Sequence, residues 1–311
     1  MKKFFALLMV SVMVFVLAAC GGNNDNASED QNSEGSNNAE GEEIKELTLG
    51  FIPSQEAEQI ADTVEPLEAY LTEELGVPVH AEVMIDFVGL VEGMRTGQID
   101  IGFTNPFGYV QAVDRAEVEV LLKAIRNGSD TYKAQFVTAA DSGLDSIDDI
   151  VNTEGLTWAY GDPLSTSGYL FPASLLMDEG IEDLETYYQQ TAVGGHDNAI
   201  LAVYDGQADF ATTFDDARSI LEKDHPDVKD KLQVIGYTDP IPNDGISVSK
   251  DLPDEWKTKI KDAFMAINDN SEVLEVMNEV YSWDGIAEAK DSDYDIVRDV
   301  YAKFKDQLEE Q

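Results

Sequence analysis

The sequence predicts an α/β protein with two lobes, each built on a mainly parallel sheet flanked by helices. Apolar stretches of strand length alternate with helical patterns along most of the chain, which is typical of parallel sheets covered by helices on both faces. The alternation occurs in two series, and the last helical segments return to the first series. We therefore expect crossing hinge strands between lobe 1, formed by residues 44–138 and 245–311, and lobe 2, formed by residues 139–244.

The first series is anchored by one clear helical pattern. Apolar residues recur at helical spacing from Ile60 to Leu75, and Gly76 then fits the end of a helix. Strands of this series are expected over residues 46–52, 79–85, 99–103, 118–125 and 132–139, and helices over 56–75, 88–95 and 106–115.

The second series repeats the alternation, and the chain then becomes mostly helical. Ligands of open α/β sheets bind outside the carboxyl ends of the strands, so we expect a ligand in the cleft between the lobes. Strands of this part are expected over residues 156–160, 187–192, 209–213, 232–237 and 246–249, and helices over 167–177, 199–204, 253–268, 273–281 and 294–308.

The first twenty residues predict the compartment. Two lysines precede an almost unbroken apolar run from Phe4 to Leu17, which is typical of a secretory signal and short for a membrane span. The run ends in the letters LAAC, the pattern of a bacterial lipoprotein whose cysteine is acylated. We interpret residues 1–19 as a signal peptide and Cys20 as the lipidation site, which would anchor the protein to the outer face of the cell membrane. An ordinary signal peptide with a leftover cysteine is the alternative.

The segment that follows is acidic and poor in core-forming residues. Residues 21–43 contain no aromatic, β-branched or basic residue, so they cannot bury enough apolar surface to offset the entropy of ordering. We expect residues 20–43 to act as a flexible tether. The whole chain carries 62 Asp and Glu against 20 Lys and Arg, a net charge of −42. This balance argues against nucleic acid as a partner.

A turn rich in hydroxyl groups is the strongest candidate for a binding site. Ser165, Thr166 and Ser167 lie between a strand that ends at Tyr160 and a helix. The first N–H groups of a helix lack partners and lie at the positive end of its dipole, so hydroxyls there would add neutral donors for a tetrahedral oxyanion. Gly168 would allow close approach, and no long cationic side chain would be needed. A plain N-cap explains the same residues equally well.

Several short motifs follow one another in a fixed order. They are DFVGLVEGMR at 86–95, GQIDI at 97–101, GDPLSTSG at 161–168, GHDNA at 195–199, DGQAD at 205–209 and IPNDG at 241–245. In this order they resemble the PhnD-like family of phosphate, phosphite and phosphonate receptors of ABC transporters, and the string DPLSTSG is the most specific of them. The resemblance implies a type II periplasmic-binding-protein fold whose lobes close around the ligand and present it to a permease. It implies a monomer without enzymatic activity, metal or cofactor.

The resemblance also implies how the phosphorus group would be bound. The turn from Ser165 to Gly168 matches the family's phosphonate-binding turn. His196 matches a histidine that reaches the phosphonate oxygens, and Tyr132 matches a cleft tyrosine whose hydroxyl completes the ring of donors. Phe87 stands where several members have tyrosine, which removes one donor.

Two acids are implied on the opposite side of the ligand. Asp244 matches an acid of the family, and Asp216 falls where aminophosphonate binders carry a glutamate. Acids opposite an anion pocket make sense when the ligand also carries a cation such as an ammonium. Asp216 is one methylene shorter than glutamate, and the adjacent Asp215 is an alternative for its role. The sequence therefore leaves open whether the ligand is a phosphonate, phosphite or phosphate.

Two other functions use some of the same residues. A secreted hydrolase would pair Ser165 or Ser167 with His196, but the chain has no Gly-x-Ser-x-Gly motif, and adjacent hydroxyls suit binding better than one activated nucleophile. A receptor for a metal or another small anion would use His196 with Asp197, Asp216 and Asp244. That reading would leave the hydroxyl turn without a purpose, so we favour phosphorus-oxyanion capture.

Overall fold

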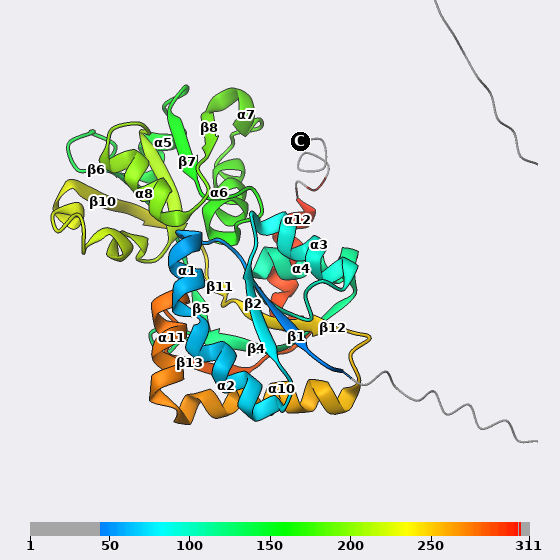
Figure 1. Cartoon of the computed structure of the whole chain (residues 1–311). Helices are drawn as coiled ribbons and strands as arrows, with labels where there is room; N and C mark the ends of the chain where they lie inside the picture. The colour runs from blue at the N-terminus through cyan, green and yellow to red at the C-terminus, as the bar shows by residue number, and fades with distance from the viewer. Residues whose placement is uncertain (1–43, 304, 306–311) are drawn as a thin grey trace, which may run out of the picture. The chain divides into compact units, whose positions relative to one another are not determined.

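The computed structural model describes residues 44–303 and 305, which form two lobes, each built on its own sheet (Figure 1). The predicted signal peptide, the lipidation site Cys20 and the tether lie outside these residues. The two sheets have the strand orders β13-β4-β12-β3-β1-β2 and β10-β6-β9-β7-β8.

The first sheet is mixed. Its parallel pairs are β1 with β2 and β1 with β3, whereas β12 and β13 both run antiparallel to β4, and β12 also runs antiparallel to β3. Four of its six strands, β1, β2, β3 and β4, therefore point the same way, as predicted for a mainly parallel sheet. The two strands added after the chain returns from the second lobe, β12 and β13, point the opposite way. The strands are β1 (Leu47–Phe51), β2 (Val79–Val83), β3 (Ile101–Thr104), β4 (Val118–Ile125), β12 (Gly245–Ser249) and β13 (Gly285–Glu288).

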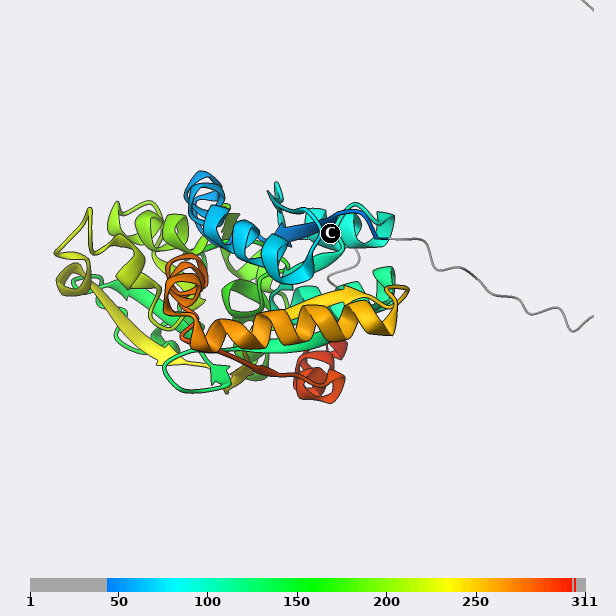
Figure 2. The same ribbon diagram turned by 60° about the horizontal axis from the view of Figure 1, so that its bottom comes forward.

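Helices cover both faces of this sheet. On one face α10 packs on α2, β4 and β13, and Figure 2 shows α10 in orange along the length of the sheet. The predicted helix over 56–75 is divided at Val64, because Pro66 cannot donate a hydrogen bond and suits the first turn of a new helix. Gly76 ends that helix with φ 74°, as expected. One face carries α1 (Ala57–Thr63), α2 (Glu65–Leu75), α10 (Asp254–Ala266) and α11 (Ser271–Tyr281), and the other α3 (Phe87–Thr96), α4 (Pro106–Ala116) and α12 (Asp295–Ala302).

The second sheet is also mixed and separates two kinds of side chain. β7 runs parallel to β8 and β9, whereas β6 runs antiparallel to β9 and β10. Because successive residues of a strand point to opposite faces, Trp158 and Phe210 stack on one face with ring centroids 5.7 Å apart. Their neighbours Ala159 and Ala211 pack on the other face against α8 (His196–Tyr204). The strands are β6 (Ala134–Ala139), β7 (Thr157–Tyr160), β8 (Gln189–Ala192), β9 (Phe210–Phe214) and β10 (Leu232–Tyr237).

The chain crosses between the lobes at a short antiparallel pair, β5 (Thr131–Tyr132) with β11 (Ile241–Pro242) (Figure 1). The hydrogen bonds of β6 place it in the second sheet. A boundary after residue 138 would leave most of β6 in the first lobe, so the division between lobes falls at β5 and β11. The expected strand over 132–139 merged β5 with β6 because Lys133, which separates them, does not interrupt the apolar pattern.

The sequence patterns did not predict several short elements. Most of these elements are too short to show a helical period, and β13 is too polar to resemble a buried strand. They comprise α5 (Ile147–Val151), α7 (Leu184–Tyr187), α9 (Val228–Lys231), the 3₁₀ helices η2 (Ala217–Leu221), η3 (Ile267–Asp269) and η4 (Asp291–Tyr294), and β13.

Packing in the first lobe makes a direct prediction about stability. Phe103 is 1% exposed and stacks on Phe51 with ring centroids 4.3 Å apart. Phe103→Ala should lower the free energy of unfolding by about 3–5 kcal/mol, because it removes buried apolar surface and leaves a cavity. Urea unfolding measures the change. Ile296→Ala, at a side chain 46% exposed, is the control and should change it by less than about 0.5 kcal/mol. Equal effects of the two substitutions would contradict the packing described.

Candidate functional site

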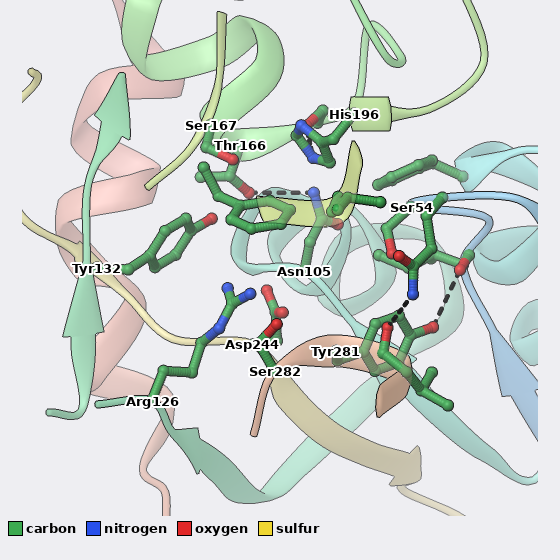
Figure 3. Close-up of a pocket in the computed structure, with 17 residues that line it drawn as sticks. Ser54, Asn105, Arg126, Tyr132, Thr166, Ser167, His196, Asp244, Tyr281 and Ser282 are labelled. Atoms are coloured by element: carbon green, nitrogen blue, oxygen red, sulfur yellow. Dashed lines mark hydrogen bonds between the residues drawn. The ribbon is translucent and has the colours of Figure 1, made fainter. Parts of the chain in front are cut away.

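A cavity with about 500 Å³ of empty space lies where the two lobes meet (Figure 3). Most of its walls come from segments that follow strand ends, as expected for ligands of open α/β sheets. Ser54 follows β1, Asn105 follows β3, the hydroxyl turn follows β7, and His196 follows β8. The lining residues are Ile52, Ser54, Gln55, Phe87, Asn105, Arg126, Tyr132, Ser165, Thr166, Ser167, His196, Phe214, Ile220, Asp244, Val280, Tyr281 and Ser282.

The hydroxyl turn opens the helical segment as the sequence predicted, but through a wider first turn. Ser165 O accepts from the N–H groups of Tyr169 and Leu170 at 3.0 and 3.1 Å, so η1 (Thr166–Leu170) is a π-helix that leads into α6 (Phe171–Asp178). Ser165 Oγ accepts from Gly168 N at 3.0 Å, so Ser165 is an N-cap and also lines the cavity. Within the part of the chain that the structure describes, the N–H groups of Thr166 and Ser167 have no hydrogen-bond partner.

Two hydrogen bonds within the protein determine whether the Thr166 hydroxyl donates or accepts. Its Oγ1 accepts from Asn105 Nδ2 at 3.1 Å and from the backbone N–H of Phe107 at 2.9 Å. Since a hydroxyl oxygen has two lone pairs, both acceptor positions are used, and the O–H of Thr166 acts as a donor. Thr166 is fully buried and lines the cavity, so a ligand oxygen there would accept this hydrogen.

The same contacts join the two lobes. Asn105 of the first lobe donates to Leu164 O at 2.8 Å as well as to Thr166, and His196 N donates to Ser54 O at 3.0 Å. The lobes therefore touch on two sides of the cavity. Asn105 is held for this role, because its Oδ1 caps α4 by accepting from Gly108 N at 2.9 Å.

His196 is a neutral imidazole at ordinary pH. Burial, helped by the positive charge of Arg126, lowers the pKa of His196 to about 3. Its Nε2 lies 3.5 Å from Ser165 Oγ, and its buried Nδ1 has no hydrogen-bond partner among the described residues. A buried polar atom without a hydrogen-bond partner costs free energy. A ligand that formed a hydrogen bond with His196 would remove this cost.

Tyr132 supplies a protonated phenol from the crossing strand β5. Burial raises the pKa of Tyr132, and the negative charge of Asp244 raises it further, against a smaller opposite effect of the Ser167 hydroxyl. The phenol therefore stays a hydrogen-bond donor at neutral pH. Phe87, at the start of α3, also lines the cavity, with 3% of its surface exposed, and contributes an apolar wall where a tyrosine would offer a donor.

Asp244 and Arg126 lie together on the side of the cavity opposite the hydroxyl turn (Figure 3). Burial raises the pKa of Asp244, and the charge of Arg126 partly offsets that rise. The sequence analysis missed Arg126 and predicted a pocket of neutral donors without a cation. A usable signal was present, because Arg126 directly follows the buried strand β4, at the strand end where ligands bind.

Asp216 does not reach the cavity, which corrects its expected role. Its carboxylate accepts from Arg218 Nε at 2.9 Å and Nη2 at 2.8 Å, and from Gln135 Nε2 at 3.2 Å. Burial favours a raised pKa, but these hydrogen bonds outweigh it and hold the pKa of Asp216 below its usual value. Asp215 does not line the cavity either, and its Oδ1 accepts from Lys133 N at 3.3 Å. Asp244 is thus the carboxylate that lines the cavity.

Gly168 also stands outside the lining, and its role is steric. A Cβ atom added at Gly168 would lie 2.7 Å from Ser165 Oγ, so only glycine lets the cap close. Seven of the nine residues predicted to bind the ligand therefore line the cavity: Ser165, Thr166, Ser167, Tyr132, His196, Asp244 and Phe87.

The comparison with known families identifies the family of the chain. Residues 49–294 match the family described as "ABC transporter, phosphonate, periplasmic substrate-binding protein". The chain belongs to this family. Its fold is accordingly the type II periplasmic-binding-protein fold that the sequence predicted, and its family places it outside the cytoplasm.

Individual relatives carry related names. The chain is 30% identical over 226 residues to the phosphonates-binding periplasmic protein of Escherichia coli, which covers 72% of this chain and 67% of that protein. It is 29% identical to the phosphate-import protein PhnD of Mycolicibacterium smegmatis, over 82% of this chain and 84% of the relative. A binding component of an ABC phosphonate transporter from Pseudomonas aeruginosa superposes with TM-score 0.77 and 28% identity, covering 86% and 88% of the two chains.

These relatives are transport binding proteins and not enzymes. Within residues 44–303, no helix combines the length and apolar character needed to cross a membrane. The same residues hold no group of three or more His, Cys, Asp or Glu side chains placed to bind a metal ion. The four residues considered for a metal site are not brought together, because Asp216 is held by Arg218 outside the cavity.

The neutral state of His196 predicts a specific pH dependence. Since the folded pKa is about 3 and an unfolded histidine titrates near 6.5, the unfolded chain binds more protons between these values. This contribution to stability is present above about pH 6.5 and falls as the pH drops, by up to about 1.4 kcal/mol per pH unit. Urea unfolding between about pH 5 and 7 should show a weaker pH dependence in His196→Gln than in the unsubstituted protein.

The matched control is Ser174→Ala, at a buried serine outside the cavity. It removes no titratable group, so it should leave the pH dependence of the unfolding free energy unchanged. The slope is compared within each protein, so lost packing in His196→Gln does not affect the test. If the unfolding free energy of His196→Gln depends on pH as steeply as that of the unsubstituted protein, the description of His196 as a neutral, buried histidine is wrong.

Proposed function

We propose that the protein captures a phosphonate, or a closely related phosphorus oxyanion, in the cavity between its lobes and delivers it to the permease of an ABC importer. One observation carries the proposal: both acceptor positions of the Thr166 hydroxyl are used within the protein, which leaves its O–H as a donor for a ligand in the cavity that Thr166 lines. Around it lie the free N–H groups of the turn, the Ser167 hydroxyl and the protonated Tyr132. A tetrahedral oxyanion has the acceptors that such a set of donors needs.

The names of the relatives support the same class of ligand. The relative from Escherichia coli is named for phosphonates and the one from Mycolicibacterium smegmatis for phosphate import. Both ligands present tetrahedral phosphorus with several oxygen acceptors. The proposal therefore rests on the shared phosphorus group, and the second group of the ligand is argued separately below.

The closeness of Ser165 and His196 does not favour a hydrolase. A nucleophilic serine needs a base that is oriented by a third group. Ser165 Oγ is held as an N-cap by Gly168 N, and His196 Nδ1 has no partner among the described residues. The arrangement suits binding, in which the histidine remains available to the ligand.

Removing one hydroxyl tests the binding turn. Ser167→Ala should weaken binding of methylphosphonate by about 10- to 100-fold, because a hydrogen bond to a charged group contributes about 1.5–3 kcal/mol. Calorimetry with methylphosphonate, phosphite, phosphate and sulfate gives the affinities and their order. Ser174→Ala, at a buried serine of α6 outside the cavity, is the matched control and should bind normally. Unchanged affinity in Ser167→Ala would remove this turn from the site.

The proposed attachment to the membrane has its own test. The LAAC sequence supports acylation of Cys20, which would keep the binding protein beside its permease. Cys20→Ser should abolish incorporation of a labelled fatty acid and move the protein from the membrane fraction to the medium or periplasm. Fractionation of cells that express each form measures this. A Cys20→Ser protein that still carries the label in the membrane fraction would contradict acylation at this residue.

A further inference from the structure

Arg126 is a buried cation that the phosphorus-binding turn does not account for. It is 8% exposed, and its guanidinium carbon lies 5.5 Å from the ring centroid of Tyr132 and 4.7 Å from that of Phe214. None of the ion pairs among residues 44–303 and 305 includes Arg126. The aromatic rings thus hold the guanidinium in the cavity wall without a direct anionic partner.

The guanidinium of Arg126 is positioned to bind an anionic group. It presents five N–H donors in a planar fork that matches a carboxylate, and a buried charge without a partner is costly. The rings of Tyr132 and Phe214 restrict its motion and partly compensate its charge. Binding an anionic group would therefore satisfy donors that the folded chain leaves open.

The phosphorus group and Arg126 lie on different sides of the cavity. Figure 3 shows Thr166, Ser167 and His196 on one side and Arg126 with Asp244 on the other, with Tyr132 between them. A phosphonate bound at the hydroxyl turn would direct its carbon substituent toward Arg126 and Asp244. Among the described residues no ion pair joins these two side chains, although the charge of Arg126 acts on Asp244. A substituent on this side would therefore offer each of them a direct partner.

The charges on that side are one cation and one acid. Asp216, which would have supplied a second acid, is occupied by Arg218 outside the cavity. A substituent with an ammonium alone would leave Arg126 unpaired, and one with a carboxylate alone would face Asp244. A substituent that carries both groups matches the pair.

We propose that the ligand is a phosphonate with an amino-acid-like substituent, whose carboxylate is bound by Arg126 and whose ammonium is bound by Asp244. This inference rests on the proposed function, because it places the phosphorus group at the hydroxyl turn. Arg126 then determines specificity among phosphonates, in addition to the capture of their common phosphorus group.

Four ligands that differ only at one carbon test the inference. Ethylphosphonate carries neither group, 2-aminoethylphosphonate carries the amine, 3-phosphonopropionate carries the carboxylate, and 2-amino-3-phosphonopropionate carries both. Calorimetry on the unsubstituted protein should rank the last ligand first, at least about tenfold tighter than 2-aminoethylphosphonate. A ranking in which the carboxylate adds no affinity would overturn the inference, and this result requires no variant.

Substitution of Arg126 identifies the group that it binds. Arg126→Gln should weaken the two carboxylated ligands by about 10- to 100-fold and change the other two by less than about threefold. Arg126→Lys keeps the charge but loses the planar fork. Its affinities for the two carboxylated ligands should therefore lie between those of Arg126→Gln and those of the unsubstituted protein. Arg298→Gln, at an arginine of α12 paired with Asp295, is the matched control and should retain all four affinities. Thermal melting establishes that each variant is folded.

The outcomes separate this inference from the proposed function. Equal weakening of all four ligands in Arg126→Gln would show that Arg126 binds the phosphorus group, which overturns the inference and keeps phosphonate capture. No effect of Arg126→Gln on any ligand would also overturn it. If none of the four ligands binds the unsubstituted protein, the proposed function itself fails, and the inference fails with it.

Discussion

The start of the helical segment after β7 is the constraint on which the cleft depends. Helix formation leaves the first N–H groups without partners, and burial makes that state costly unless a side chain or a ligand satisfies them. Here the Ser165 side chain satisfies only Gly168 N, and Thr166 and Ser167 of the wider π turn lie at the cavity wall. The same turn meets the first lobe through Asn105. One short segment therefore forms part of the cavity wall and part of the contact between the lobes.

Electrostatics divides the cavity into two regions with different chemistry. The side of the cavity that carries the hydroxyl turn consists of groups that are uncharged at neutral pH, since His196 is neutral and Tyr132 is protonated. Neutral donors can approach an anion at little cost in desolvation, and they suit a chain with a net charge of −42, where a free cation would attract the protein's own carboxylates. The opposite side carries the guanidinium of Arg126, which lies over the rings of Tyr132 and Phe214, and the carboxyl group of Asp244.

The sequence predicted most of what local patterns encode. Helical spacing from Ile60 to Leu75 and the stop at Gly76 were confirmed, and the hydroxyl turn lies at the cavity. The errors came from information that spacing does not carry. The role expected of Asp216 was wrong because Asp216 pairs with Arg218, a neighbour two residues away that folds back onto it. Arg126 was missed because its one signal is its place at the carboxyl end of β4, and the spacing of the residues around it adds nothing to that.

The two hydrogen bonds that Thr166 Oγ1 accepts have a consequence for the timing of selection. Both come from the first lobe, so they exist only while the lobes are in contact. With the lobes apart, the hydroxyl of Thr166 would be free to accept as well as to donate. Contact between the lobes removes that freedom. Under the proposed function, the demand of Thr166 for a hydrogen-bond acceptor would therefore apply only to a ligand that both lobes already enclose.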